Sequence, residues 1–333
     1  MPPRPAARAA RRLGLGVLLA ASVTLALAGC ATSGAWDLSG DLSTHDPALA
    51  RDGDTWYVYS TGNGTVADGN VQVRSSSDGR SWRYEGEVWD EKPEWIDEAV
   101  PGVDNLWAPE LVEHDGTWYL YYSASRFGKN ASVIALATNT TLDPDDPAYD
   151  WVDRGPVIAS APGDDFNAID PGVVDDHGTP WMSFGSFWSG IRMVELEWPS
   201  GLRADEAEPL RLADRGAPPN AIEAPHLLEH DGHWFLFVSR DDCCQGADST
   251  YKVAVGRADA PTGPFIDRDG VPLLEDGGTV LLETAGRRIG PGGQSVADGM
   301  MALHYYDRDL NGQFQLALVP LGWDADGWPV LRW

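Results

Sequence analysis

Three carboxylates occur in similar surroundings at three places in the sequence. Asp46 lies ten residues before a tryptophan, and Asp170 and Glu223 each lie eleven residues before one. Cleavage of a glycosidic bond needs one carboxyl group that donates a proton to the leaving oxygen and a second that activates water or attacks carbon. A third carboxylate nearby raises the pKa of the acid by charge repulsion and helps to keep it protonated. These residues therefore predict acid–base cleavage of a sugar chain.

The carboxylates lie within a repeat that occurs five times. In each repeat a turn, Asp-Gly in most cases, precedes a strand of alternating apolar residues, which is a strong β-hairpin signal. The five turn-and-strand segments are 52–59, 115–121, 176–184, 231–237 and 298–304. Third strands follow at 71–73, 133–136, 191–194, 251–255 and 314–318, and the clearest fourth strands are 82–84, 151–153 and 328–330. Four antiparallel strands repeated five times predict an all-β fold, a five-bladed β-propeller, whereas an open β-sandwich needs no such period.

The repeat also predicts where the carboxylates lie. Because the first strand of each blade lines the central axis, equal spacing places Asp46, Asp170 and Glu223 at one end of that axis. Each second strand is antiparallel to the first and returns to the same end. The ends of the second strands, which we expect to rim this mouth, are Phe127-Gly128, Ser186-Phe187-Trp188, Cys243-Cys244 and Tyr305-Tyr306. Aromatic rings around clustered carboxylates indicate a sugar site.

The segments that carry the carboxylates are distinctive. They read Asp46-Pro47, Ile169-Asp170-Pro171 and Ile222-Glu223-Ala224-Pro225, and further characteristic segments are 121–125, 127–128, 183–188, 243–244, 249–252, 255–257, 290–296 and 304–307. Together they resemble glycoside hydrolase family 43, in particular its endo-α-1,5-L-arabinanase branch, over residues 42–333. The resemblance implies internal hydrolysis of α-1,5-L-arabinofuranosidic bonds in arabinan, with inversion. It implies Asp46 as general base, Glu223 as general acid, and Asp170 as the residue that modulates the pKa of the acid and orients it.

The same resemblance implies residues that bind substrate and metal. The substrate contacts that it implies are Trp107, Gly128, Asn167, Ser186, Phe187 and Trp188. It implies one calcium ion in the axial channel, with His304 as the one protein ligand and waters completing the shell, although calcium prefers oxygen ligands. No organic cofactor is expected. Glu110 departs from the pattern, since many relatives are expected to have Asp there.

The first thirty residues have the layout of an export signal. Four arginines precede a run of Leu, Val and Ala that ends in Leu27-Ala28-Gly29-Cys30. We interpret residues 1–30 as a signal peptide with a lipobox, so that Cys30 carries the lipid that anchors the mature chain outside the cytoplasm. A transmembrane anchor is the alternative, but the apolar run is shorter than the roughly 20 residues of a membrane span. Residues 31–41 are expected to be a linker and 42–333 the catalytic propeller.

Charge and cysteine content bound the partners. The formal net charge is −27, which repels phosphate backbones and excludes nucleic acid as an expected partner. A neutral polysaccharide such as arabinan is compatible with this charge, and a monomer is expected. Once Cys30 is assigned to lipid, Cys243 and Cys244 remain. Adjacent Cα atoms are closer than in ordinary disulfides, so both a strained bond and two packed thiols remain open.

Two other functions fit parts of the sequence. An exo-acting arabinofuranosidase or β-xylosidase would share the carboxylates and differ in loops that close one end of the groove. No large insertion is visible, which favours an open groove. A lipid-anchored protein that binds glycans without cleaving them is the second alternative, and the presence of all three carboxylates argues against it.

Overall fold

The computed structural model describes residues 1–3, 34–65 and 68–333. The expected signal peptide, the lipobox with Cys30 and the start of the expected linker therefore lie almost wholly outside the described residues. The described residues 34–65 and 68–333 belong to one compact unit. Within the described ranges no helix is both long and apolar enough to span a bilayer.

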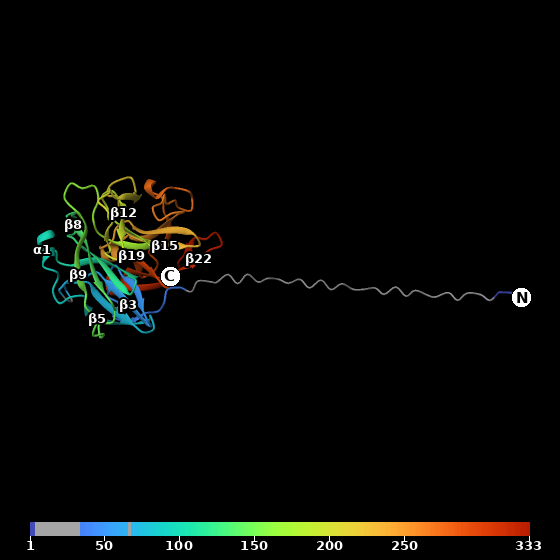
Figure 1. The fold of residues 1–333 in the computed structure, drawn as a ribbon, viewed down its shortest axis with the longest axis horizontal. Helices are drawn as coiled ribbons and strands as arrows, with labels where there is room; N and C mark the ends of the chain where they lie inside the picture. Colours follow the sequence, from blue (N-terminus) through green and yellow to red (C-terminus); the bar gives the residue numbers. More distant parts are fainter. Residues whose placement is uncertain (4–33, 66–67) are drawn as a thin grey trace. The chain divides into compact units, whose positions relative to one another are not determined.

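Strands dominate the described chain, in five sheets and one short hairpin (Figure 1). The first sheet holds β1 (Ser39–Gly40), β2 (Ala48–Asp52), β3 (Thr55–Ser60), β4 (Gln72–Ser76) and β5 (Ser81–Glu87). The second holds β6 (Leu106–His114), β7 (Thr117–Ala124), β8 (Ser132–Asn139) and β9 (Val152–Ser160). The third holds β10 (Gly172–Asp176), β11 (Thr179–Phe184) and β12 (Ile191–Glu197), and β12 also pairs with β13 (Leu202–Arg203) and β14 (Leu210–Ala213).

The two remaining blades complete the set. The fourth sheet holds β15 (Ile222–His230), β16 (His233–Arg240), β17 (Lys252–Ala258) and β18 (Thr279–Leu282). The fifth holds β19 (Arg288–Ala297), β20 (Met300–Asp307) and β21 (Gln313–Pro320), and β22 (Gly322–Trp323) pairs separately with β23 (Pro329–Val330). The helices are short: α1 (Trp95–Ala99) and the 3-10 turns η1 (Gly246–Asp248), η2 (Leu273–Glu275) and η3 (Arg308–Leu310).

The predicted turns form the hairpins between first and second strands. Asp115 and Gly116 both have positive φ, 49° and 77°, in the two-residue loop between β6 and β7. The corresponding pairs in the third, fourth and fifth blades also have two positive φ values. This is the backbone of a type I′ turn, whose twist matches that of the flanking strands and which Asp-Gly favours.

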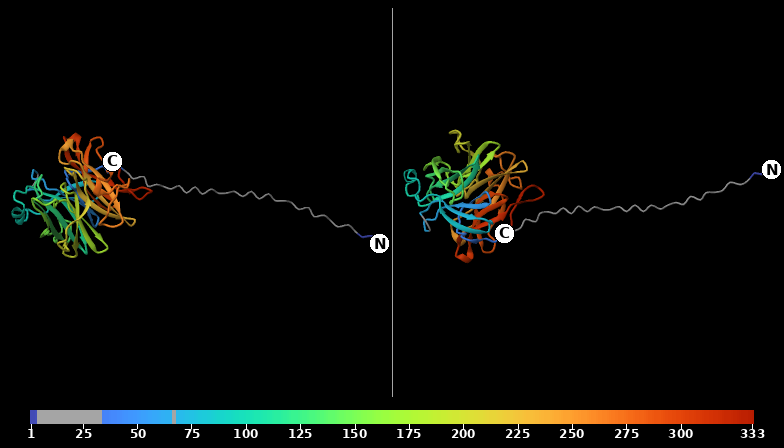
Figure 2. Two further views of the ribbon diagram at one scale, coloured as in Figure 1. Left: turned by 90° about the horizontal axis from the view of Figure 1, so that it is seen from above. Right: turned by 60° about the horizontal axis from the view of Figure 1, so that its bottom comes forward.

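The five sheets close into a ring. The first strands β2, β6, β10, β15 and β19 contact one another in this order, and β19 contacts β2 again. One cluster of buried apolar side chains fills each of the five junctions between neighbouring blades. In Figure 2 the sequence colours follow one another around the folded part from blue to red. The predicted five-bladed β-propeller is confirmed.

The last blade is completed differently from the prediction. The predicted fourth strand, 328–330, pairs only with β22. The outer edge of β21 is instead covered by residues 36–42: Trp36 N–H donates to the Leu318 carbonyl, and Leu316 N–H donates to that of Leu42, at 2.9 and 2.8 Å. The segment also pairs with β5 through β1. Residues 34–41 are thus part of the fold, and the predicted linker is wrong there, because an open strand edge gains hydrogen bonds from any extended segment that reaches it.

Candidate active site

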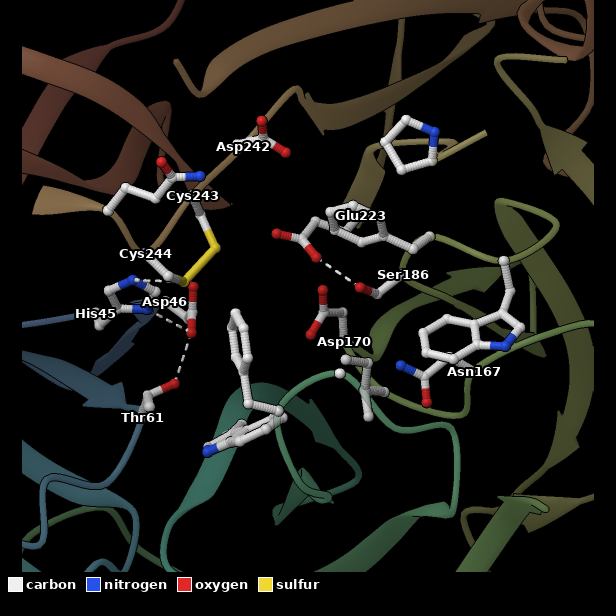
Figure 3. Close-up of a pocket in the computed structure, with 18 of the residues that line it drawn as sticks. His45, Asp46, Thr61, Asn167, Asp170, Ser186, Glu223, Asp242, Cys243 and Cys244 are labelled. Atoms are coloured by element: carbon white, nitrogen blue, oxygen red, sulfur yellow. Dashed lines mark hydrogen bonds and ion pairs between the residues drawn. A yellow bond between two sulfur atoms is a disulfide. The ribbon is translucent and has the colours of Figure 1, made fainter. Parts of the chain in front are cut away.

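A cavity of about 1390 Å³ opens at one end of the propeller axis. Asp46, Asp170 and Glu223 all line it, as do the six expected substrate contacts, Trp107, Gly128, Asn167, Ser186, Phe187 and Trp188. Figure 3 shows the three carboxylates facing a common space from three sides. Of the residues predicted to rim this mouth, Tyr305 is the exception: its ring packs into the core between the fourth and fifth blades.

The inner strands enter this end of the axis through one repeated backbone turn. In each blade one residue there has a left-handed conformation: Asp46, Ala108, Asp170, Ala224 and Gly293, with φ of 50°, 42°, 59°, 49° and 60°. Asp46 and Asp170 therefore occupy equivalent positions, whereas Glu223 lies one residue earlier. The equal spacing of Asp170 and Glu223 from their tryptophans was misleading, because Trp181 is the third residue of β11 and Trp234 the second of β16.

The main-chain N–H of each of these five residues donates a hydrogen bond to a side chain of another residue. In four blades the acceptor is a side chain in the second strand of the preceding blade or directly after it. The bonds are Ala108 to Thr61, Asp170 to Ser123, Gly293 to Ser239 and Asp46 to His304, at 2.9 to 3.1 Å. In the remaining blade Ala224 N–H donates to Asp170 Oδ2 at 3.1 Å. The backbone that carries Glu223 is thus held directly by Asp170.

Asp46 is surrounded by donors. Thr61 Oγ1 donates to Asp46 Oδ2 at 2.6 Å, and His45 Nδ1 lies 2.8 Å from the same oxygen. Burial by itself would raise the pKa of Asp46, but the neighbouring His45 ring with its hydrogen bond, the His304 ring and the Thr61 hydroxyl together hold it well below its usual range. Asp46 is therefore an ionised carboxylate at neutral pH, which is the state that a general base requires.

Glu223 has the opposite tendency. Its carboxyl group is buried and accepts hydrogen bonds from Ser186 Oγ at 2.5 Å and Tyr251 Oη at 2.7 Å. Burial raises the pKa of Glu223 and outweighs these two donors, and the charge of Asp46 adds to the rise. Burial and then the charges of Glu223 and Asp46 raise the pKa of Asp170 well above its usual value. The Asp170–Glu223 pair therefore retains a proton to higher pH than an exposed carboxyl group would.

Two further buried groups lie on the inner strands, away from this cavity. Glu110 on β6 is buried, and burial raises its pKa to about 8. His226 on β15 accepts the Val296 N–H through Nε2 and turns Nδ1 toward Glu110 Oε1 at 3.7 Å, while burial lowers its pKa to about 4. Both groups are therefore uncharged near pH 7. Glu110, which departs from the expected Asp, is thus a buried group that packs beside His226.

Several residues that the fold brings to the carboxylates were not predicted from the sequence. Thr61 follows β3, and Tyr251 precedes β17, where it was expected only to begin a strand. His45, which directly precedes Asp46, was given no role. The signal that could have found Thr61 is its place in the repeat, because Ser123 and Ser239 occupy the same position in other blades.

The cysteine question has a definite outcome. Cys243 and Cys244 are joined by a disulfide, and both line the cavity. Of the two states that the sequence left open, the structure thus shows the bonded one.

Comparison of the whole sequence with known protein families agrees with the geometry of this site. The model of the glycosyl hydrolases family 43 matches residues 40–329. The chain belongs to this family. It is 40% identical to an extracellular exo-α-(1→5)-L-arabinofuranosidase of Cellvibrio japonicus, with 86% of each chain covered. It is 37% identical to an extracellular endo-α-(1→5)-L-arabinanase of Bacillus subtilis, covering 93% of this chain and 94% of that protein.

Solved structures of this family have the same fold. The family 43 endo-arabinanase of Bacillus licheniformis superposes with a TM-score of 0.83 at 39% identity, covering 89% of this chain and 99% of that one. The family 43 assignment made from the signature segments is therefore confirmed.

Proposed function

We propose that this chain hydrolyses α-1,5-linked arabinan internally, with inversion of the anomeric configuration. The observation that carries the proposal is one cavity in which an ionised carboxylate, Asp46, faces a buried pair, Asp170 and Glu223, that retains a proton. Carboxyl groups with opposite protonation are what glycoside hydrolysis requires. Similarity to a named endo-arabinanase over most of both chains supports arabinan as the substrate.

The residues divide the reaction between them. Asp46 takes a proton from water as the water attacks the anomeric carbon, and the hydrogen bonds from Thr61 and His45 hold its carboxylate in place. Glu223 gives its proton to the leaving oxygen, while Ser186 and Tyr251 fix the orientation of its carboxyl group. Asp170 holds the backbone at Ala224, and because its charge and that of Glu223 repel each other, we assign to Asp170 the modulation of the pKa of the acid.

The walls of the cavity supply the sugar contacts. We assign substrate binding to the six residues Trp107, Gly128, Asn167, Ser186, Phe187 and Trp188. Phe127 and Trp188 are exposed large apolar side chains on this wall, at 81% and 38%, so their rings can pack against the apolar faces of sugar rings. Asn167 is held by Ser132, whose hydroxyl donates to its Oδ1 at 2.7 Å.

The size of the cavity favours attack within a chain. Its volume of about 1390 Å³ exceeds the roughly 300–1,000 Å³ that is typical of sites for small molecules. A space of this size accommodates several sugar units. An exo-acting arabinofuranosidase is the second candidate, because a relative with that name is 40% identical to this chain. A β-xylosidase or a binding protein without activity has no comparable support.

We also propose a calcium ion in the axial channel with His304 as its one protein ligand. His304 is fully buried, its Nε2 has no hydrogen-bond partner among the described residues, and burial keeps its pKa well below the usual value. A neutral, unpartnered nitrogen of this kind fits an ion whose other ligands are waters. Coordination through Nε2 requires the ring proton to be on Nδ1, so the Asp46 N–H, which donates to Nδ1 at 3.1 Å in this structure, would lose that bond when the ion binds. The ion would add positive charge beside the base and favour its ionised form.

Export is the remaining part of the proposal. Both relatives named above are described as extracellular. We propose that residues 1–30 direct export, that Cys30 carries the lipid anchor, and that the mature protein is a membrane-anchored monomer. Labelling of the expressed chain with a radioactive fatty acid, with Cys30→Ala as the control, tests the anchor.

The product profile tests the function. Debranched arabinan incubated with the protein should give oligosaccharides before monosaccharide, and Asp46→Asn should give neither. Monosaccharide alone at early times would replace the endo assignment with the exo one. The absence of any product would refute arabinan hydrolysis. Proton NMR of the first product formed reports inversion or retention.

A further inference from the structure

The Cys243–Cys244 disulfide lies on the same wall of the cavity as Asp46. Both cysteines line the cavity, and Cys244 is exposed to it. Figure 3 shows the disulfide beside His45 and Asp46, on the side of the cavity opposite Asn167. None of the catalytic steps above uses this bond.

A continuous row of contacts joins this turn to the base. Cys244 N–H donates to Tyr306 Oη at 2.8 Å, and that hydroxyl lies 2.8 Å from His45 Nε2. On the other side of the ring, His45 Nδ1 lies 2.8 Å from Asp46 Oδ2. The sulfur of Cys244 is itself 4.0 Å from His45 Nε2.

The main-chain donor sets the direction of these bonds. Because Tyr306 Oη accepts from Cys244, its own hydrogen is available for His45 Nε2. When Nε2 accepts this hydrogen, the ring proton of His45 is on Nδ1, from which it is donated to Asp46 Oδ2. His45 also stacks on His304 with ring centroids 3.6 Å apart, which fixes the plane of the ring.

The backbone at Cys244 needs support to take part. The φ of Cys244 is 66°, in the left-handed region that is unfavourable for a residue other than glycine. The residue lies between β16 and η1, outside any strand. A covalent bond between the side chains of adjacent residues closes a small ring through their peptide unit and removes most of its rotational freedom.

We infer that the Cys243–Cys244 disulfide is a positioning element for the general base. It holds the Cys244 N–H against Tyr306, and through Tyr306 and His45 it keeps the Asp46 carboxylate in one orientation. This inference rests on the proposed hydrolysis. It predicts that loss of the bond lowers kcat, whereas a disulfide that served only as a wall for the sugar would change KM.

Reduction of the full chain with dithiothreitol tests the inference. The reagent supplies two electrons and two protons, so the S–S bond breaks to give two thiols while the reagent closes to its own cyclic disulfide. We expect kcat on debranched arabinan to fall about tenfold, which corresponds to the loss of one hydrogen bond in a buried polar network. KM should change by less than about twofold, and reoxidation should restore kcat.

Two variants make the result specific. The double variant C243S/C244S lacks the disulfide, so its kcat should already be low. It retains Cys30, so the absence of any response to the reagent would show that the Cys243–Cys244 bond is responsible. In Tyr306→Phe the hydroxyl between the turn and His45 is missing, and reduction should then have no further effect on kcat. Thermal unfolding followed by circular dichroism shows whether each protein is folded when it is assayed.

Several outcomes would overturn the inference: an unchanged kcat after complete reduction, a change in KM alone, or the same response in Tyr306→Phe as in the parent. The inference can also be separated from the proposed function. The ¹⁵N shifts of the His45 ring report which nitrogen carries the proton, whatever the substrate. If reduction leaves them unchanged, the inference fails. If they change while the untreated chain does not cleave arabinan, only the proposed function fails.

Discussion

Replacing Tyr251 by phenylalanine isolates one bond to the proposed acid. The Tyr251 hydroxyl donates to Glu223 Oε1 at 2.7 Å and contributes to lowering the pKa of Glu223. A hydrogen bond to a charged group is worth about 1.5–3 kcal/mol, and one pKa unit corresponds to about 1.4 kcal/mol. The donor favours the ionised carboxylate, so its loss should raise the pKa of the acid by roughly one to two units.

The sign of this shift makes the test decisive. A general acid must be protonated, so a higher pKa moves the alkaline limb of the pH–rate profile to higher pH. On debranched arabinan, the plateau of kcat/KM for Tyr251→Phe should extend to a pH about one unit or more higher than for the parent. The height of the plateau should fall, because a weaker acid transfers its proton less readily.

A matched variant checks the reasoning. Ser186 donates to the other oxygen of the same carboxyl group, so Ser186→Ala should move the same limb in the same direction. The acidic limb, which belongs to Asp46, should stay in place in both variants. An alkaline limb that does not move, or that moves to lower pH in Tyr251→Phe, would refute the assignment of Glu223 as the acid.

Three other expectations concern the base, a buried carboxyl group and the closure of the ring. Asp46→Asn should lower kcat by about 10²- to 10⁴-fold at unchanged thermal stability, and near-normal turnover would exclude it as the base. Because burial raises the pKa of Glu110 to about 8, the folded state binds more protons than the unfolded state between about pH 5 and 8, and stability falls as pH rises. Glu110→Gln should therefore gain up to about 1.4 kcal/mol per pH unit over the parent in this window, measured by urea unfolding, and a constant difference would contradict the argument. Trp36 packs at the junction of the last and first blades and its ring lies 4.4 Å from the guanidinium of Arg80, so Trp36→Ala should lower the free energy of unfolding by about 1–3 kcal/mol. Asp37→Asn, at the exposed neighbouring residue, should leave the free energy of unfolding almost unchanged. Equal effects of the two variants would show that Trp36 does not hold the junction of the last and first blades.

The local signals in the sequence were sufficient for the blades but not for their closure. The Asp-Gly turns define each hairpin through backbone conformation alone, so the repeat could be counted without tertiary information. The outer edge of β21 is covered by residues 36–42, and no local preference in that segment indicates a partner near the other end of the chain, at Leu316 and Leu318. Register at long range depends on which edge is open once the ring has formed.

The candidate site, like the fold, could be predicted from local signals only in part. Asp46, Asp170 and Glu223 were found because the repeat carries them to one end of the axis, but the one-residue offset of Glu223 was hidden by the position of Trp181 in its strand. Two of the groups that adjust their protonation, Tyr251 and Thr61, lie elsewhere in the same blades. Tyr251 and Thr61 reach the carboxylates only through packing, so their contribution to the two pKa values could not be read from spacing.

The two ends of the described fold meet at the junction of the last and first blades, where Ala35 N–H donates to the Arg332 carbonyl at 3.0 Å. In a chain that crosses a membrane amino-terminus first, residues 36–42 would therefore emerge at once. They could pair with β21 only after the last blade had also crossed and folded. Until then the first blade, which carries Asp46, has no fifth blade to supply the His304 contact to its backbone. The hydrolytic site would thus appear only when the circle is complete, and the enzyme's activity would serve as a direct signal that the last blade has folded.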